Sequence, residues 1–183
     1  MMPSRAWRPA IGRYLAVTAA GSLAWEFAQT PFYTLWRTGS VWGIVFAVLH
    51  CTAGDVLIAG ASLAASLLLF GAAGWPRSRF VQVAAAAVIF GLSITVLVEH
   101  LATARGIWTY SELMPVVPGL GTGLAPLAQW VVVPLLAFMA ARLPTRSKLR
   151  RVRGDRRLDP AMGAITTSAA APDHLARPIR RVS

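Results

Sequence analysis

Charged residues and cysteine are both scarce in this 183-residue chain. Asp, Glu, Lys and Arg make up 14 % of the residues, whereas a soluble domain usually carries about 25 %. Only seven of these charged residues are acidic, and the single cysteine, Cys51, excludes an internal disulfide. In contrast, 56 % of the residues are hydrophobic. This composition predicts an all-α protein that crosses a membrane several times.

The net charge of +11 does not indicate a nucleic-acid partner, because the basic residues are clustered. Eleven of the 18 Lys and Arg residues lie between Arg142 and Arg181, after the last apolar segment. Basic residues beside a membrane span mark its cytoplasmic side and attract anionic lipid headgroups. We therefore predict that residues 143–183 form a basic, disordered tail in the cytoplasm, whose partner is the lipid bilayer.

Four apolar segments are suited to cross the hydrocarbon core of a bilayer, which is about 30 Å thick, as helices. We predict that residues 1–142 form a four-helix transmembrane bundle, with spans at about 10–29, 51–73, 80–102 and 123–141. A cleaved signal peptide is the alternative for the first segment. Arg13 within that segment and Glu26 near its end argue against cleavage.

Residues 41–74 carry one formal charge, Asp55, and are too long for one simple span. As a helix this stretch would be roughly 50 Å long at 1.5 Å per residue. We predict a separate interfacial or re-entrant helix over residues 41–49, followed by the second span from Cys51. A carboxylate within a span is costly unless it has a partner or faces water, so Asp55 is expected to have a partner.

The distribution of basic residues predicts the orientation in the membrane. The N-terminal segment, the turn at residues 75–79 and the tail hold all the Lys and Arg residues except Arg37 and Arg105. With four spans these three segments share one side, which the positive-inside rule places in the cytoplasm. Both termini are therefore predicted to be cytoplasmic.

The acidic residues outside the tail are predicted to gather at the opposite, outer end of the bundle. Glu26, Asp55 and Glu99 each belong to a different span, and His50 and His100 lie at the same level. Paired carboxylates in a low-dielectric site are suited to general acid–base catalysis, with the histidines as a base or as metal ligands. Each of these side chains also has a structural interpretation, as a hydrogen-bonded or interfacial residue.

Further polar and aromatic side chains are candidates for binding a substrate at this end: Gln29, Trp108, Tyr110 and Gln129. Trp108 and Tyr110 belong to a loop at residues 103–122 that combines turn-forming residues with apolar ones. This mixture favours a lid packed over the bundle, with an interfacial anchoring segment as the alternative. His50, His100, Asp55 and Glu99 are metal ligands by residue type, but no HExxH, HxxxH or CxxC motif is present and no cofactor is identified.

The sequence leaves open two functions from different classes. The first is an enzyme or binder that acts on a small lipid-soluble molecule in a polar pocket at the outer end. The second is a non-catalytic membrane protein whose polar cluster holds the helices together or docks a partner subunit. A continuous pore is not favoured, because the inner half of the second and third spans offers only Ser62, Ser66 and Gln82 as polar residues.

Three stretches of sequence resemble a group of small bacterial inner-membrane proteins. They are WEFAQTPFYTLW at residues 25–36, HCTAGDVLIA at residues 50–59, and WTYSELMPVVPGLGTGLAPLAQW at residues 108–130. The resemblance covers roughly residues 20–140 and does not include the tail. It implies the helical fold and a location in the bacterial inner (cytoplasmic) membrane, and it implies no particular activity.

Overall fold

The computed structural model describes residues 7–143, and these residues are almost entirely helical. Four long helices are joined by short segments, and the only β-structure in this range is two isolated bridges. The predicted tail at residues 143–183 lies outside the described residues apart from Leu143. The elements in chain order are α1 (Trp7–Gln29), η1 (Thr30–Phe32), α2 (Leu35–Thr38), α3 (Val41–Phe70), α4 (Phe80–Ala104) and α5 (Leu124–Arg142).

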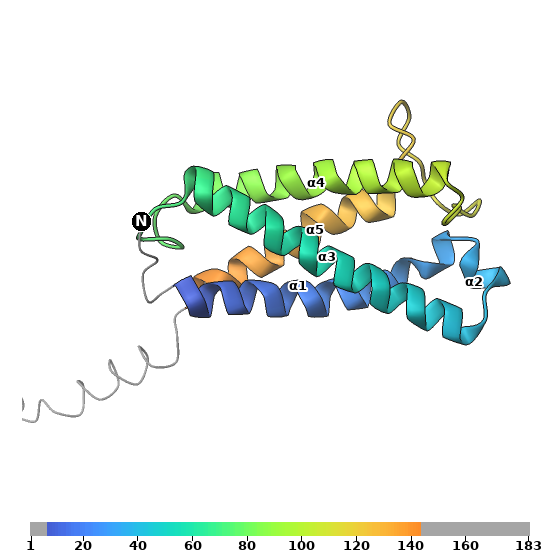
Figure 1. The fold of residues 1–183 in the computed structure, drawn as a ribbon, viewed down its shortest axis with the longest axis horizontal. Helices are drawn as coiled ribbons and strands as arrows, with labels where there is room; N and C mark the ends of the chain where they lie inside the picture. The colour runs from blue at the N-terminus through green and yellow to red at the C-terminus, as the bar shows by residue number, and fades with distance from the viewer. Residues whose placement is uncertain (1–6, 144–183) are drawn as a thin grey trace, which may run out of the picture. The chain divides into compact units, whose positions relative to one another are not determined.

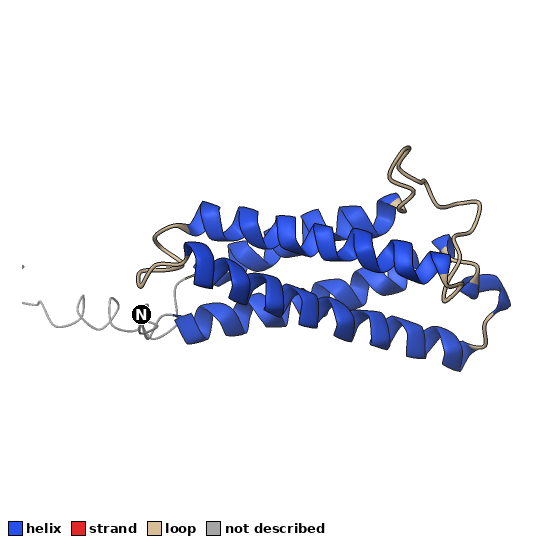
Figure 2. Ribbon diagram, turned by 45° about the horizontal axis from the view of Figure 1, so that its top comes forward, coloured by secondary structure: helices blue, strands red, loops and turns tan. Residues whose placement is uncertain are grey.

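The four long helices form an up-down-up-down bundle (Figures 1 and 2). Helix α1 packs against α3 and α5, and α4 packs against the same two helices. Helices α3, α4 and α5 are each long and apolar enough to cross a membrane. The predicted crossing by α1 stays a prediction, because that helix carries Arg8, Arg13 and Glu26 among its 23 residues.

Helix α3 differs from the prediction at its start. The sequence predicts a separate helix over residues 41–49, but the structure has one continuous helix of 30 residues from Val41 to Phe70. Ser40 caps its first turn by accepting a hydrogen bond from Gly43 N at 3.1 Å. No proline or side-chain cap interrupts the helix near His50, so the separate helix is a wrong prediction. At roughly 45 Å, α3 is longer than a bilayer core.

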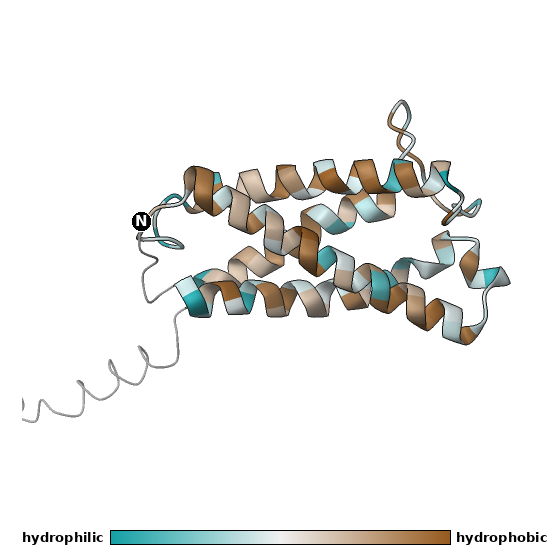
Figure 3. Cartoon of the chain, viewed as in Figure 1, coloured by the Kyte–Doolittle hydropathy of each residue, from teal (hydrophilic) through white to brown (hydrophobic). Residues whose placement is uncertain are grey.

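The buried face of α4 is a stripe of residues spaced three or four apart, several of which are small. In α4 the buried residues are Val83, Ala87, Gly91, Thr95, Glu99 and Ala102. Gly91 lies directly against the Trp130 ring of α5, where a Cβ atom would overlap the indole. The outward faces carry exposed apolar side chains such as Phe46, Leu57 and Leu68 of α3, and Figure 3 shows apolar residues along the whole bundle. This pattern is typical of helices packed inside a bilayer.

The two ends of the bundle differ in the charge of their residues. The basic end comprises the start of α1, the α3–α4 connection and the end of α5, with Arg8, Arg13, Arg77, Arg79 and Arg142. The acidic end comprises the end of α1, η1, α2, the start of α3, the end of α4, the loop at residues 105–123 and the start of α5.

Arg13 at the basic end does not extend freely to the interface. Its guanidinium donates hydrogen bonds to three carbonyl oxygens at the end of α5: Ala140 at 2.9 Å, Ala141 at 3.0 Å and Leu143 at 2.7 Å. The last carbonyls of a helix have no partner within it and carry partial negative charge. Arg13 therefore caps α5 and joins it to α1.

Candidate functional site

A cavity of about 440 Å³ lies at the acidic end, between all four long helices. Its wall includes the three carboxylates that the sequence predicts at this end, each from a different helix: Glu26 of α1, Asp55 of α3 and Glu99 of α4. Helix α5 contributes Gln129. We call this space the carboxylate cavity. The remainder of its wall is mainly aliphatic and aromatic, including Ile58, Val98, Ile107 and Trp130.

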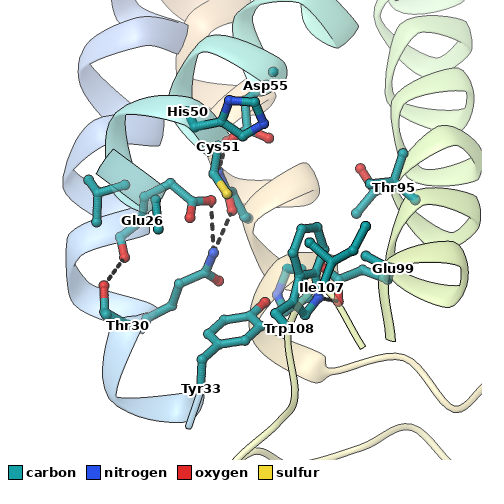
Figure 4. A pocket seen from close by; sticks show the side chains of 18 of the residues that line it. Glu26, Thr30, Tyr33, His50, Cys51, Asp55, Thr95, Glu99, Ile107 and Trp108 are labelled. Carbon is teal, nitrogen blue, oxygen red and sulfur yellow. Dashed lines mark hydrogen bonds between the residues drawn. The ribbon is translucent and has the colours of Figure 1, made fainter. Parts of the chain in front are cut away.

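A chain of hydrogen bonds connects two of the carboxylates across three helices (Figure 4). Gln29 Nε2 donates to Glu26 Oε1 at 2.8 Å and lies 3.4 Å from Gln129 Oε1. Gln129 Nε2 in turn donates to Asp55 Oδ2 at 2.5 Å. Glu26 and Gln29 meet because residues three apart share a helix face. Asp55 thus has the partner that a carboxylate within a span requires, and this partner is an amide.

Glu99 is held separately, by the loop at residues 105–123. Tyr110 Oη donates to Glu99 Oε2 at 2.5 Å, and Trp108 Nε1 donates to the same oxygen at 3.3 Å. Tyr110 Oη also accepts a hydrogen bond from Gly123 N at 3.0 Å, which fixes the phenol in place. Both donors are therefore aimed at one oxygen of a buried carboxylate.

The loop that carries these donors is packed onto the bundle. Thr34 N donates to Thr109 O at 3.0 Å, and Ser111 N donates to Phe32 O at 2.8 Å. The two bonds flank the bridge between Tyr33 and Tyr110, whose rings are 5.7 Å apart. The lid interpretation agrees with these contacts, and Ile107 and Trp108 of the loop also line the carboxylate cavity.

The two tyrosines remain protonated at neutral pH. Burial raises the pKa of the Tyr110 phenol above its ordinary range, and its hydrogen bond to Glu99 raises this pKa further. Burial, followed by the nearby carboxylate of Glu99, also raises the pKa of Tyr33. Tyr110 is therefore a hydrogen-bond donor to Glu99 throughout the physiological pH range.

The two candidate histidines are not brought together. His50 lines the cavity, but its ring is exposed and stacks on Phe46 with centroids 5.6 Å apart. His100 is exposed, does not line the cavity, and its Nδ1 lies 2.8 Å from Val96 O. Within residues 7–143, no group of three or more His, Cys, Asp or Glu residues is placed to hold a metal ion. The predicted ligand set of His50, His100, Asp55 and Glu99 is therefore not assembled.

The candidate binding residues are placed as follows. Gln29, Trp108 and Gln129 line the cavity, whereas Tyr110 lies behind Glu99 and acts on it by a hydrogen bond. Tyr33 is not among the residues predicted from the sequence, but this side chain also lines the cavity. Nothing in the local sequence reveals this, because η1 and the loop at residues 105–123 position Tyr33 together.

Comparisons with protein-family models, with curated proteins and with solved structures give no match to this chain. The fold and the site define a class only: an all-helical protein with three helices apolar enough to span a membrane and a carboxylate-lined cavity at one end of the bundle. The geometry of that cavity is therefore the basis on which a function can be proposed.

Proposed function

We propose that the protein is a four-span integral membrane protein of the bacterial inner membrane that binds a small lipid-soluble molecule in the carboxylate cavity. The observation that carries the proposal is the cavity itself. Its volume of about 440 Å³ falls within the range of roughly 300–1,000 Å³ found for small-molecule sites. Apolar walls with a few converging polar groups are also the usual composition of such sites.

The proposed orientation places the acidic end on the periplasmic side and both termini in the cytoplasm. Its support is the grouping of Arg8, Arg13, Arg77, Arg79 and Arg142 at one end of the bundle. Basic residues beside spans stay in the cytoplasm during membrane insertion. The cavity would then be reached from the periplasm or from the outer leaflet.

In the catalytic form of this proposal, the carboxylates transfer protons to and from the bound molecule. Glu26 and Asp55 each accept a hydrogen bond at one oxygen from the glutamine chain, which fixes the orientation of both carboxylates. Glu99 receives both of its donors at Oε2, which leaves Oε1 available. Three oriented carboxylates around one apolar space support acid–base chemistry on a lipid-soluble substrate.

A structural role is the second candidate, and a specific contact favours it. The bond between Gln129 and Asp55 joins α5 to α3, which are not neighbours in the ring of four helices. Interhelical hydrogen bonds of this kind contribute about 0.6 kcal/mol on average within membranes. In this alternative the polar cluster holds the bundle together or docks a partner subunit, and the cavity has no ligand.

The Asp55→Asn variant distinguishes the two candidates. It keeps the size of the side chain and removes its charge. The matched control is Glu112→Gln, which makes the same change in charge at an exposed loop residue outside the cavity. Each protein is purified in mild detergent, and its bound molecules and melting temperature are measured by native mass spectrometry and thermal unfolding.

If the proposal holds, the wild-type protein and Glu112→Gln carry a small molecule that Asp55→Asn loses, while all three melt at similar temperatures. A fall in melting temperature for Asp55→Asn alone, with no molecule bound to any of the three, contradicts the proposal and supports the structural role.

A further inference from the structure

Some buried polar atoms in the wall of the carboxylate cavity have no hydrogen-bond partner within residues 7–143. Seven buried side-chain polar atoms among the described residues have no partner, and two of them belong to the cavity wall: Gln29 Oε1 and Thr95 Oγ1. Gln29 is 5 % exposed and Thr95 is 7 % exposed. Figure 4 shows Thr95 among the side chains that surround the cavity. Buried polar groups in proteins are nearly always hydrogen-bonded, so these two are free to bond a molecule that enters the cavity.

The amide donors of this region, the indole of Trp108 and the phenol of Tyr110 are already in use. The amide nitrogens of Gln29 and Gln129 donate to oxygens of Glu26, Gln129 and Asp55. The side chains of Trp108 and Tyr110 both donate to Glu99. What remains around the cavity is mainly a set of acceptors, one amide oxygen and three carboxylates, together with the hydroxyls of Thr95 and Tyr33, which can accept or donate. A molecule that satisfies them must provide hydrogen-bond donors.

The charge of the wall points to the same chemistry. The two basic side chains that line the cavity, His50 and Arg105, are both exposed. Among residues 7–143, neither forms a hydrogen bond to Glu26, Asp55 or Glu99. Three carboxylates within one largely apolar space repel each other unless a cation joins them or they become protonated.

The remaining walls are suited to the rest of such a molecule. Tyr33 and Trp108 present aromatic rings between Glu26 on one side and Glu99 on the other (Figure 4). Aromatic faces attract cations, in addition to excluding water. Ile58, Val98 and Trp130 supply an apolar surface for a hydrocarbon body.

We propose that the carboxylate cavity binds a lipophilic primary amine, with the three N–H groups of the ammonium donating to Thr95 Oγ1 and to the nearest carboxylate oxygens, and with the hydrocarbon body against the apolar wall. This inference rests on the proposed binding function and narrows the ligand to one chemical class. A primary ammonium group combines positive charge with three N–H donors on one small atom, which suits a space lined by several acceptors.

The test uses three probes with the same hydrocarbon chain and different head groups. Octylamine carries charge and N–H donors at pH 7, octyltrimethylammonium carries charge without donors, and octanol carries one donor without charge. Each is titrated into the full-length protein in phosphatidylcholine nanodiscs, and binding is followed by tryptophan fluorescence. Empty nanodiscs are titrated in parallel to remove the contribution of partitioning into lipid. We expect octylamine to bind about tenfold or more tightly than either of the other two probes.

Two matched variants locate the head group. Thr95→Val removes a buried hydroxyl that lines the cavity, and Thr18→Val removes a buried, equally unpartnered hydroxyl of α1 outside it. We expect Thr95→Val to weaken octylamine binding about tenfold, since a hydrogen bond to a charged group is lost. Thr18→Val should leave it unchanged. Equal effects of the two variants overturn the placement of the amine.

The outcomes separate this inference from the proposed function. If octanol or octyltrimethylammonium binds as tightly as octylamine and Asp55→Asn abolishes that binding, the amine inference is overturned and the cavity remains a binding site. If no probe gives more binding than it gives with empty nanodiscs, and native mass spectrometry finds no molecule on the purified protein, both proposals are contradicted.

Discussion

The two ends of the bundle are built from the same helices, yet the space between the helices is used differently at each end. At the basic end, the guanidinium of Arg13 is engaged by three carbonyls of α5, and large side chains fill the space between the helices. At the acidic end, the helices separate around a cavity, and two buried acceptors of its wall have no partner. Under the proposed function, the basic end provides stability and the acidic end receives the ligand.

Truncation of a core side chain at the basic end tests this division with the largest expected effect. Phe138 is buried and packs on Tyr14 and Phe80, with ring centroids 4.7 and 5.8 Å away. Phe138→Ala is expected to lower the free energy of unfolding by about 3–5 kcal/mol, because it leaves a cavity. The measurement is equilibrium unfolding in mixed micelles. Octylamine affinity, measured on the folded fraction, should not change, and a loss of affinity would show that the two ends are not separate.

The cap on α5 should have an intermediate effect. Arg13→Met keeps the long side chain and removes the hydrogen bonds to Ala140, Ala141 and Leu143. We expect a loss of about 1–3 kcal/mol in the same unfolding experiment. Arg8→Met is the control, since Arg8 is exposed in the first turn of the same helix. If both variants unfold alike, the interpretation of Arg13 as a structural cap is wrong.

A smaller change in stability is expected from Tyr110→Phe at the acidic end. The substitution removes the donor to Glu99 Oε2 and leaves Trp108 as the remaining donor. Because Tyr110 is only half-buried, we expect a loss of about 1 kcal/mol.

Ligand affinity should respond more strongly than stability, because Glu99 loses its fixed orientation. Titration of octylamine into the variant measures this directly. An unchanged octylamine affinity would show that Glu99 does not take part in binding.

Much of the fold follows from the sequence, because the apolar segments and the charges between them determine where helices begin and end. On these grounds the sequence predicts four long helices and the convergence of Glu26, Asp55 and Glu99 at one end, and the structure brings these three residues together. The chain gives no local indication of where a long apolar stretch should break, so the predicted separate helix at residues 41–49 is wrong. The number of spans and the orientation in the membrane stay predictions.

The finer arrangement of the site depends on tertiary contacts that no sequence pattern records. His100 directly follows Glu99 in the sequence, so it lies at the same depth as the cluster. Its position around the helix axis, however, turns its side chain away from the cavity. Tyr33 is not recognisable from the sequence, because its position depends on pairing with Tyr110, far along the chain. The glutamine chain that links Glu26 to Asp55 likewise requires α1 and α5 to be adjacent.

The most direct test of the account uses Cys51, the single cysteine of the chain, which lines the carboxylate cavity. The rate of its modification by N-ethylmaleimide is followed by intact mass in nanodiscs at one pH, with and without octylamine or octanol. The control replaces Cys51 by Ala and introduces Leu57→Cys, at an exposed position of the same helix that does not line the cavity.

If the cavity binds small lipid-soluble molecules, octylamine slows modification of Cys51, the protection disappears in Asp55→Asn, and the control thiol reacts at an unchanged rate. If neither molecule slows modification of Cys51, or if both thiols are slowed equally, the cavity is not a binding site and the central claim is contradicted.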